Sequence, residues 1–344
     1  IIHHLAVDGV SWRILMEHLD LLYRQLENKD AIELPPKTTS YRHWAERLTE
    51  HAQTEELQRE LPFWLSVQEA EISPLPVDYP QGMNSNTEAT ADSISTSLDV
   101  ENTQLLLKEV PKAYQTQIND VLLAALAQAV IQWTGTSTLL VDLEGHGREA
   151  ILEDADLSRT VGWFTSIFPV SVSLEKDSDW GELLKSTKEQ LRHIPNRGIG
   201  YGLLRYLRKD PETSERLRAL PQAEVSFNYL GQFDQVLSPT SPFKLTNEPY
   251  GPRRSLRGNR RYLLEIGGSI VGGELRLTWV YSRNIHQKRT IELLAQGFME
   301  ALRNLIDHCQ TPAAGGFTPS DFPEADLSQK ELDDLMSEIS KLEV

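Results

Sequence analysis

Residues 118–133 read INDVLLAALAQAVIQW, and residues 138–143 read TLLVDL. The first stretch is apolar on nearly every face of a helix, which predicts a helix that is buried on all sides. The second is a short apolar run of the length of a strand. A buried helix next to a buried strand indicates a core of mixed helices and strands, and therefore an α/β domain.

The rest of the C-terminal half continues this alternation. Apolar residues at helical spacing predict further helices, and short apolar runs predict further strands. The helices cover 101–108, 180–193 and 290–308, and the strands cover 167–174, 225–230, 262–271 and 274–281. Gly272 and Gly273 separate the last two strands, which is typical of a β-hairpin with a two-residue turn. Ser328 and Glu331 form a capping box that opens a charged C-terminal helix.

The N-terminal part is predicted to be helical and to end in a linker. Residues 11–28 carry apolar side chains at helical spacing, with Ser11 as the expected N-cap. A second helical stretch covers 40–65. The prolines of 73–80 exclude a helix there, and polar residues follow to about residue 97. We therefore expect a boundary between two lobes over 73–97.

Composition places the chain among ordinary globular proteins and excludes several partners. Of 344 residues, 40% are hydrophobic and 24% are charged, and no apolar run is long enough for a transmembrane helix. The net charge of −16 argues against a nucleic-acid partner. Cys309 is the single cysteine, which excludes an internal disulfide, favours a reducing, cytoplasmic compartment and suggests a bystander thiol. Because Ile1 is neither an initiator methionine nor part of a signal peptide, the sequence is expected to begin mid-chain.

The first cluster of reactive side chains is HHLAVDG, residues 3–9. We expect a strand that ends here in a tight loop. Neighbouring strand residues point to opposite sides, so only one of His3 and His4 can face a given cleft. A histidine there suits a general base, because its unperturbed pKa lies near neutrality. The alternative is a histidine pair satisfied inside the fold. A metal site is disfavoured, because the spacing to Asp8 does not place the ligands on one face.

The second cluster is EGHGRE, residues 144–149, directly after the strand 139–143. Glycines on both sides of His146 allow a sharp turn that brings Glu144 to the edge of the sheet. A carboxylate at the end of an apolar strand can have a raised pKa, as proton abstraction from carbon requires. The alternative is a polar loop with a surface glutamate.

Three further segments are unusually structured: RTVGWFT (159–165), PNRGIGYG (195–202) and FNYLGQFD (227–234). The glycines of 195–202 follow a helix instead of a strand, so a dinucleotide-binding loop is not indicated. Asn228 and Tyr229 lie at a strand end, where either could donate a hydrogen bond to an enolate oxygen, with core packing of the tyrosine as the alternative. The sequence has no nucleophile elbow and no P-loop, which excludes the serine hydrolases and P-loop enzymes that depend on them.

Taken in order, these five segments resemble the signature motifs of the epimerization domains of nonribosomal peptide synthetases, within the condensation superfamily. The matching stretches are HHLAVDGVSW, EGHGRE, RTVGWFTSIFP, IPNRGIGYG and FNYLGQFD, and they span residues 3–234. One such motif would be weak support, whereas five in order are specific. The wider similarity extends over the whole chain.

The resemblance implies an α/β fold like that of chloramphenicol acetyltransferase, with two lobes in a V and the active site in a tunnel between them. Most of the N-terminal lobe is expected to precede Ile1, so that the present chain alone would be inactive. The implied divisions are 1–72 for the remainder of the N-terminal lobe, 73–97 for the inter-lobe linker, 98–325 for the C-terminal lobe and 326–344 for a connector helix.

Residue roles follow from the matched motifs. His4 matches the active-site histidine of the family and Glu144 its active-site glutamate, so the two would face each other from different lobes. Asn228 and Tyr229 fall in a motif expected to line the same cavity and to stabilise the enolate.

Three other residues of these motifs are expected to support the site. Asp8 would pair with Arg148 to hold the histidine loop, and His3 would have a structural role.

The implied reaction is epimerization at Cα of an L-aminoacyl or peptidyl thioester, which gives a D/L mixture. The substrate would arrive on the 4'-phosphopantetheine arm of an upstream peptidyl carrier domain. The domain itself would use no metal, pyridoxal or nicotinamide, and it would contact no membrane. Two bases on opposite faces, or Glu144 alone with His4 stabilising the oxyanion, remain open. The C-terminal helix either leads to a downstream condensation domain or ends the chain.

Three alternatives compete with this interpretation. A condensation domain that forms a peptide bond would share the histidine motif but generally lacks the Glu-Gly-His-Gly pattern at Glu144. An acyltransferase acting on a soluble thioester is disfavoured by FNYLGQFD. A non-catalytic docking domain would keep the motifs only for its fold.

Overall fold

The computed structural model describes residues 2–67, 72–175, 178–232, 241–243, 251, 254–312, 314–325 and 327–342. Six strands of these residues form one mixed sheet in the order β1-β6-β5-β4-β2-β3. They are β1 (Ala91–Leu98), β2 (Thr138–Gly145), β3 (Ser166–Ser173), β4 (Val225–Gln232), β5 (Leu264–Val271) and β6 (Glu274–Ser282). The predicted α/β fold class is confirmed.

Parallel pairing is confined to the middle of the sheet. β4 runs parallel to both β2 and β5, whereas β1, β3 and β6 pair antiparallel with their neighbours. β2 and β4 therefore end at the same edge of the sheet. Side chains at the ends of both strands are brought together there.

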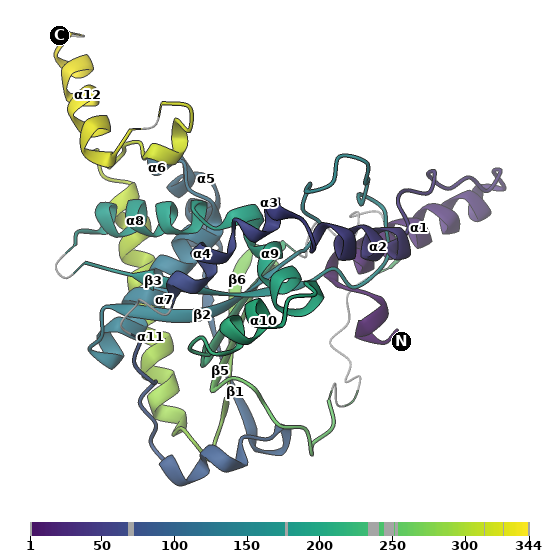
Figure 1. Cartoon of the computed structure of the whole chain (residues 1–344), viewed down its shortest axis with the longest axis horizontal. Coiled ribbons are helices and arrows are strands. Elements are labelled where there is room, and N and C mark those ends of the chain that lie inside the picture. Colours follow the sequence, from purple (N-terminus) through teal and green to yellow (C-terminus); the bar gives the residue numbers. More distant parts are fainter. Residues whose placement is uncertain are drawn as a thin grey trace.

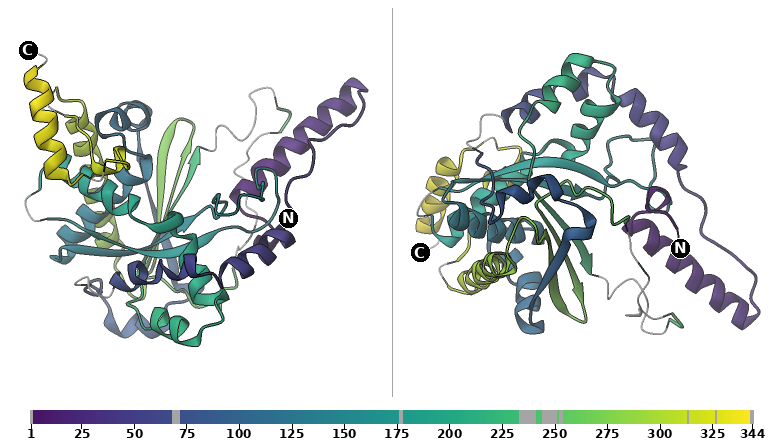
Figure 2. Two further views of the ribbon diagram at one scale, coloured as in Figure 1. Left: turned by 45° about the horizontal axis from the view of Figure 1, so that its top comes forward. Right: turned by 90° about the horizontal axis from the view of Figure 1, so that it is seen from below.

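The apolar helix predicted over 118–133 is the centre of the core. α7 (Ile118–Thr134) is buried over nearly its whole length, as its all-round apolar sequence predicted. It packs with α8 (Trp180–Arg192) and α11 (Lys288–Cys309), and α5 (Val100–Lys108) and α6 (Val110–Tyr114) lie beside them. Figures 1 and 2 show these helices together on one side of the sheet.

The opposite face of the sheet is covered only in part. Near β2, Leu140 on this face packs against Val67 and Ala223. The helices of this region are α4 (Leu61–Ser66), α9 (Ile199–Gly202) and α10 (Pro211–Arg218). The 3₁₀ turn η5 (Pro195–Gly198) precedes α9, and the π-turn η6 (Leu203–Leu207) connects α9 to α10. Along β5 and β6 the residues alternate between buried and accessible, so one face is packed and the other stays open.

The predicted hairpin is confirmed. β5 and β6 are joined by Gly272 and Gly273, whose φ angles are 64° and 78°. Positive φ at both central residues is the requirement of a type I′ turn.

The first long helix, α1 (Gly9–Asn28), extends away from the body of the molecule (Figure 1). Its N-cap is Asp8 and not Ser11, because the Asp8 carboxylate accepts a hydrogen bond from the Ser11 amide at 2.7 Å. Ser11 lies one turn further in, where its hydroxyl is free to bond elsewhere. A short 3₁₀ turn, η1 (His4–Ala6), stands directly before α1, where the sequence predicted the end of a strand.

The prediction of one continuous helical stretch over 40–65 is wrong. The region forms α2 (Tyr41–His51), α3 (Glu55–Gln58) and α4. Thr54 starts α3 anew by accepting a hydrogen bond from the Leu57 amide. Pro62 lies in the first turn of α4, where its missing N–H costs nothing, whereas within a continuous helix it would break a hydrogen bond.

The linker predicted over 73–97 extends too far, because its last residues form a strand. Residues 80–85 and 88–90 form the 3₁₀ turns η3 (Pro80–Ser85) and η4 (Glu88–Thr90), and 91–98 form β1, paired along its length with β6. β1 is rich in serine and buries Ile94 and Leu98. Trp64, assigned to the first lobe, shares the main core with Trp279 of β6. The division of the chain into lobes stays a prediction.

The C-terminal segment folds back on the helices of the core. The 3₁₀ turn η8 (Pro319–Asp321) presents Asp321 to Lys188 of α8, whose ammonium is buried and 2.6 Å from the carboxylate. α12 (Gln329–Leu342) follows, and its capping box is confirmed, since the Ser328 amide donates to the Glu331 carboxylate and the Glu331 amide donates to the Ser328 hydroxyl. No helix of the described residues is long and apolar enough to span a membrane.

Candidate functional site

A pocket of about 530 Å³ lies at the edge of the sheet where β2 and β4 end. Four residues predicted for the site lie in its wall: Asp8, Glu144, Asn228 and Tyr229. They come from the start of α1, the end of β2 and the middle of β4. The carboxyl ends of neighbouring parallel strands are a common position for ligand sites in α/β sheets.

Glu144 reaches the pocket because the chain turns sharply after β2. Gly147 has a φ of 66°, and a Cβ on it would lie 1.7 Å from the carbonyl oxygen of Phe164, so only glycine fits. The Glu144 side chain is accessible to solvent from the pocket. Surrounding protein nevertheless raises its pKa by desolvation, partly offset by attraction to His4 and Arg254.

Asn228 holds the Glu144 carboxylate. Its Nδ2 donates a hydrogen bond of 2.5 Å to Glu144 Oε2 across the β2–β4 pair. Tyr229 follows on the other face of the strand, and burial raises the pKa of its hydroxyl to about 12. Tyr229 therefore stays protonated at neutral pH and remains a hydrogen-bond donor.

His4 lies near this pair but is not among the side chains in the pocket wall. Its Nδ1 is 2.8 Å from the carbonyl oxygen of Val7. Because a carbonyl can only accept, Nδ1 carries a proton, and in the neutral ring Nε2 has the free lone pair. The ring packs against Trp163 with centroids 5.7 Å apart. A positive charge on His4 would lower the pKa of the Glu144 carboxyl by attraction.

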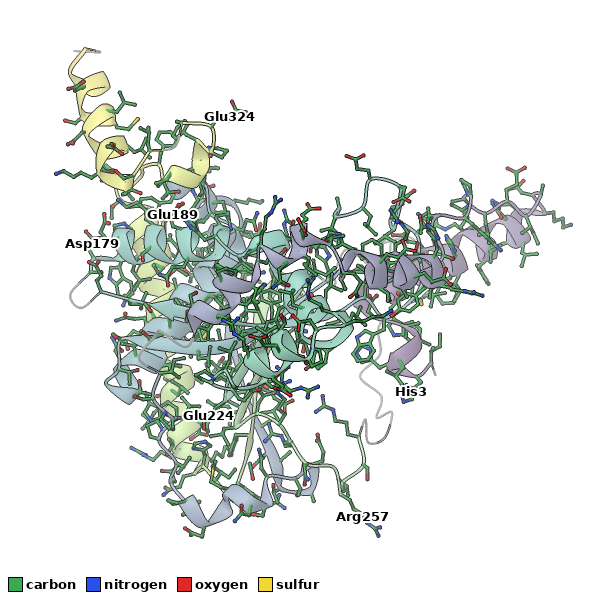
Figure 3. All side chains as sticks on the ribbon, viewed as in Figure 1. His3, Asp179, Glu189, Glu224, Arg257 and Glu324 are labelled. Atoms are coloured by element: carbon green, nitrogen blue, oxygen red, sulfur yellow. The ribbon has the colours of Figure 1, made fainter. Side chains whose placement is uncertain are left out.

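His3 has a different position from His4. Its Nδ1 accepts a hydrogen bond from the Leu5 amide at 3.1 Å and so caps η1. Figure 3 shows His3 on this turn, beside the N-terminal end of the chain. The two histidines therefore differ in their hydrogen-bond partners.

Asp8 and Arg148 form the ion pair that the sequence predicted, with Nη2 and Oδ1 3.2 Å apart. The second oxygen of Asp8 accepts a hydrogen bond from the Phe164 amide at 3.1 Å. Burial opposes ionisation of Asp8, but the hydrogen bonds from Ser11 and Phe164, together with the Arg148 charge, leave its pKa lowered. The guanidinium of Arg148 also lies 3.8 Å from the centre of the Phe164 ring.

Sequence reasoning missed the part that Ser11 has in this region. Its hydroxyl donates to the Gly162 carbonyl at 2.8 Å, accepts from the Gly162 amide at 3.0 Å and accepts from Arg148 at 3.1 Å. These contacts join the start of α1 to the loop before β3. The partner lies more than a hundred positions away in sequence, so no local pattern signals the contact.

The glycine-containing segment 195–202 also has a structural task that the sequence did not reveal. Asn196 and Arg197 both have positive φ, at 44° and 51°. The Asn196 amide donates to the buried carboxylate of Glu60 at 2.7 Å, and a Cβ on Gly200 would collide with that carboxylate. This packing fixes the left-handed turn and places Arg197 in the pocket wall.

Cys309 and the remaining predicted features lie away from this chemistry. Burial raises the pKa of the Cys309 thiol to about 11, in agreement with a bystander role. Phe233 and Asp234, the end of the FNYLGQFD motif, lie outside the described residues. Among the residues that the structure describes, no three histidine, cysteine or acidic side chains are grouped to hold a metal ion.

Comparison with known proteins identifies the family. A family model of the condensation domain matches residues 1–328. The chain is 50% identical over 343 residues to one of the proteins of the linear gramicidin synthase of Brevibacillus parabrevis, a match that covers 100% of this chain and 4% of that protein. It is 40% identical over 336 residues to surfactin synthase subunit 1 of Bacillus subtilis, covering 97% of this chain and 9% of that protein. The chain spans less than a tenth of the length of either relative.

Solved structures of related domains share the fold of this chain. The epimerization domain from the third module of tyrocidine synthetase B superimposes with a TM-score of 0.83 at 39% identity, covering 90% of this chain and 68% of that one. The cyclization-docking bidomain of EpoB from Sorangium cellulosum gives a TM-score of 0.64 at 18% identity, covering 88% and 58%, and shows the shared fold alone. The chain belongs to the condensation-domain family, and the predicted fold is confirmed.

Proposed function

We propose that this member of the condensation-domain family is an epimerization domain that inverts Cα of a carrier-bound aminoacyl or peptidyl thioester. The observation that carries the proposal is Glu144, a carboxylate with a raised pKa that is held by Asn228 in the wall of the pocket. The similarity to a solved epimerization domain supports the same activity. Epimerization would make the domain an isomerase and a part of nonribosomal peptide biosynthesis.

The proposed reaction begins with the ionised Glu144. Its carboxylate takes the proton from Cα, the C–H bond breaks, and the electron pair moves onto the thioester carbonyl to give an enolate. A protonated His4 on the opposite face returns a proton to Cα, and the carbonyl is restored. Atoms and charge balance because Glu144 gains the proton that His4 loses. In the reverse direction the two residues exchange roles.

The environment of Glu144 suits this task. Removal of a proton from carbon needs a base stronger than an ordinary surface carboxylate, and desolvation supplies that strength by raising the pKa. Tyr229 stays protonated and can donate to the developing enolate oxygen. Asn228 keeps Glu144 in place through one amide proton and has a second one for the substrate.

The remaining roles belong to the same proposal. Asp8, Arg148 and His3 hold the loops on which the reacting groups stand. The substrate is carried on the phosphopantetheine of an upstream peptidyl carrier domain in the cytoplasm. A downstream condensation domain would receive the product where α12 connects to one.

The test uses a protein that contains this chain together with its carrier domain. The carrier is loaded with an L-aminoacyl group in deuterated water, and both deuterium at Cα and the D/L ratio are measured. Glu144→Gln should lower the exchange rate roughly 10²- to 10⁴-fold, the range of general acid–base catalysis. Glu153→Gln, in the same loop but outside the pocket wall, is the matched control and should behave like the wild type. Formation of a peptide bond without exchange would identify a condensation domain instead.

A further inference from the structure

The middle of β5 contains two consecutive glycines, Gly267 and Gly268, in the sequence LEIGGSIV. Glycine inside a regular element is less stable than alanine, because its backbone loses more conformational freedom on folding. In strands it often marks a place where another group approaches the backbone closely. The surroundings of each glycine should therefore explain why it has no side chain.

The two glycines have different surroundings. A Cβ on Gly268 would make ordinary van der Waals contacts on the packed face of the sheet, 3.5 Å from Cδ2 of Tyr229 and 3.7 Å from Cδ2 of Leu277. Gly267 points to the opposite face, and a Cβ there would have no heavy atom within 4 Å. The protein's own packing therefore does not require glycine at 267.

The open space at Gly267 lies next to Asn228, the residue that holds the proposed base Glu144. Gly267 is the registered partner of Asn228, and Asn228 donates its hydrogen bond to Glu144. On its other side Gly267 pairs with Thr278 of β6. Paired residues of neighbouring strands point to the same face. Glu144, Asn228, Gly267 and Thr278 thus form a row across one face of the sheet, with a gap where a side chain would stand.

Dimensions place this gap within reach of a substrate bound at Glu144. Proton abstraction requires Cα to approach the carboxylate oxygen to about 3–3.5 Å. Neighbouring strands are about 5 Å apart, so Gly267 lies one strand beyond Asn228. The side chain on the reacting Cα, if it is as long as that of leucine or phenylalanine, can extend over Asn228 to the space above Gly267.

The surroundings of the gap suit an uncharged group. Asn228 and Thr278 carry no charge. Glu265, two residues before Gly267 on the same face, is paired with the buried Arg260 at 3.0 Å and with Arg254 at 3.6 Å. Its charge is therefore compensated.

We propose that the space above Gly267 is the subsite for the side chain of the amino acid that is inverted, and that glycine at this position admits large uncharged side chains. The inference rests on the proposed epimerization at Glu144 and adds to it a residue that determines substrate size. Filling the space should exclude large side chains and leave small ones unaffected.

The experiment compares Gly267→Ala, Gly267→Val and the wild type, each in a protein that contains the carrier domain, with the carrier loaded with L-alanine or L-phenylalanine. Exchange of the Cα hydrogen in deuterated water gives a first-order rate constant for each loaded amino acid. Gly267→Val should lower the ratio of phenylalanine to alanine roughly 10- to 200-fold, the range for steric discrimination in a pocket. Gly267→Ala should lower it less. Ser269→Leu is the matched control, because Ser269 lies on the same face of β5, two residues after Gly267. It should leave the ratio unchanged.

The outcomes separate the two proposals. An unchanged ratio in an active Gly267→Val protein, or an equal loss for both substrates, would overturn the subsite and leave epimerization standing. Absence of exchange with either substrate in the wild type would overturn epimerization and the subsite with it. Should the valine variant fail to fold, the alanine variant, whose Cβ meets no atom, gives the same comparison with a smaller effect.

Discussion

Two carboxylates in the wall of the same pocket have opposite environments. Asp8 is 3% exposed, and both of its oxygens accept hydrogen bonds from the backbone, with Arg148 beside them. Glu144 is accessible, and a hydrogen bond from the Asn228 side chain holds it. The pKa of Asp8 is lowered, whereas that of Glu144 is raised.

The difference separates a structural carboxylate from a reactive one. Asp8 is stabilised in its charged form by so many donors that neither oxygen is available as a base. Glu144 has a side-chain donor and open space, and desolvation leaves it a stronger base. The contacts that stabilise the fold lie where the start of α1 meets the loop before β3. The residues proposed to react lie where β2 ends beside β4. This division can be tested by variants of both regions, from the largest expected effect to the smallest.

Removal of the Asp8 charge should damage the fold. Asp8→Asn leaves the guanidinium of Arg148 buried without its carboxylate, which costs roughly 3–5 kcal/mol in comparable pairs. Unfolding by urea should show this loss near neutral pH. Since the lowered pKa of Asp8 contributes stability that is lost as pH falls, the difference from wild type should shrink in acid. Asp30→Asn, at an exposed position, is the control, and equal stability of the two variants at pH 7 would contradict the division.

Removal of the donor to Glu144 should affect catalysis without affecting the fold. Asn228→Ala should lower the epimerization rate roughly ten- to hundredfold, the value of a hydrogen bond to a charged group. It should also raise the pKa of Glu144 further and move the acidic limb of the pH–rate profile to higher pH. Ser226→Ala, on the same face of β4, is the control. A lower rate with an unmoved acidic limb would mean that Asn228 acts on the substrate alone.

The pH dependence of the wild type should reveal the raised pKa of Glu144 directly. The base must be ionised, so the rate of exchange should fall as pH decreases through this pKa, with a midpoint above the ordinary value of 4.5. A profile that is flat down to pH 4 would show that Glu144 does not take the proton.

The smallest effect concerns the stability of Glu144→Gln and has the opposite sign to that of Asp8→Asn. A raised pKa in the folded state means that ionised Glu144 destabilises the protein at neutral pH. The neutral glutamine should therefore raise the melting temperature slightly at pH 7 to 8. Below the pKa of the unfolded chain, where glutamic acid is protonated in both states, the difference should disappear. A lower melting temperature at pH 7 would contradict the assignment.

Local patterns in the sequence predicted most of the fold. The apolar run of α7 and the Gly272-Gly273 turn specify their structures within a few residues, because burial on all sides and positive φ leave few alternatives. β1 was missed, because its accessible face is serine-rich and its buried face carries only Ile94 and Leu98 at wide spacing. Its pairing with β6, far along the chain, decides its structure.

The site was predictable in its members but not in its geometry. The order of the motifs pointed to Glu144, Asn228 and Asp8, which all lie in one pocket wall. The network of Ser11 and the gap at Gly267 depend on the register of strands and on loops that meet across the fold. Such contacts leave no periodic signal, since each partner is an ordinary polar residue or glycine in its own segment.

The most direct test of the central claim is the deuterium content at Cα of a carrier-bound L-aminoacyl thioester after incubation in deuterated water. The wild-type protein should introduce solvent deuterium and produce the D form, and Glu144→Gln should do so at least about a hundredfold more slowly while keeping its fold. Equal rates of deuterium incorporation in the two proteins would contradict the account of Glu144 as the base.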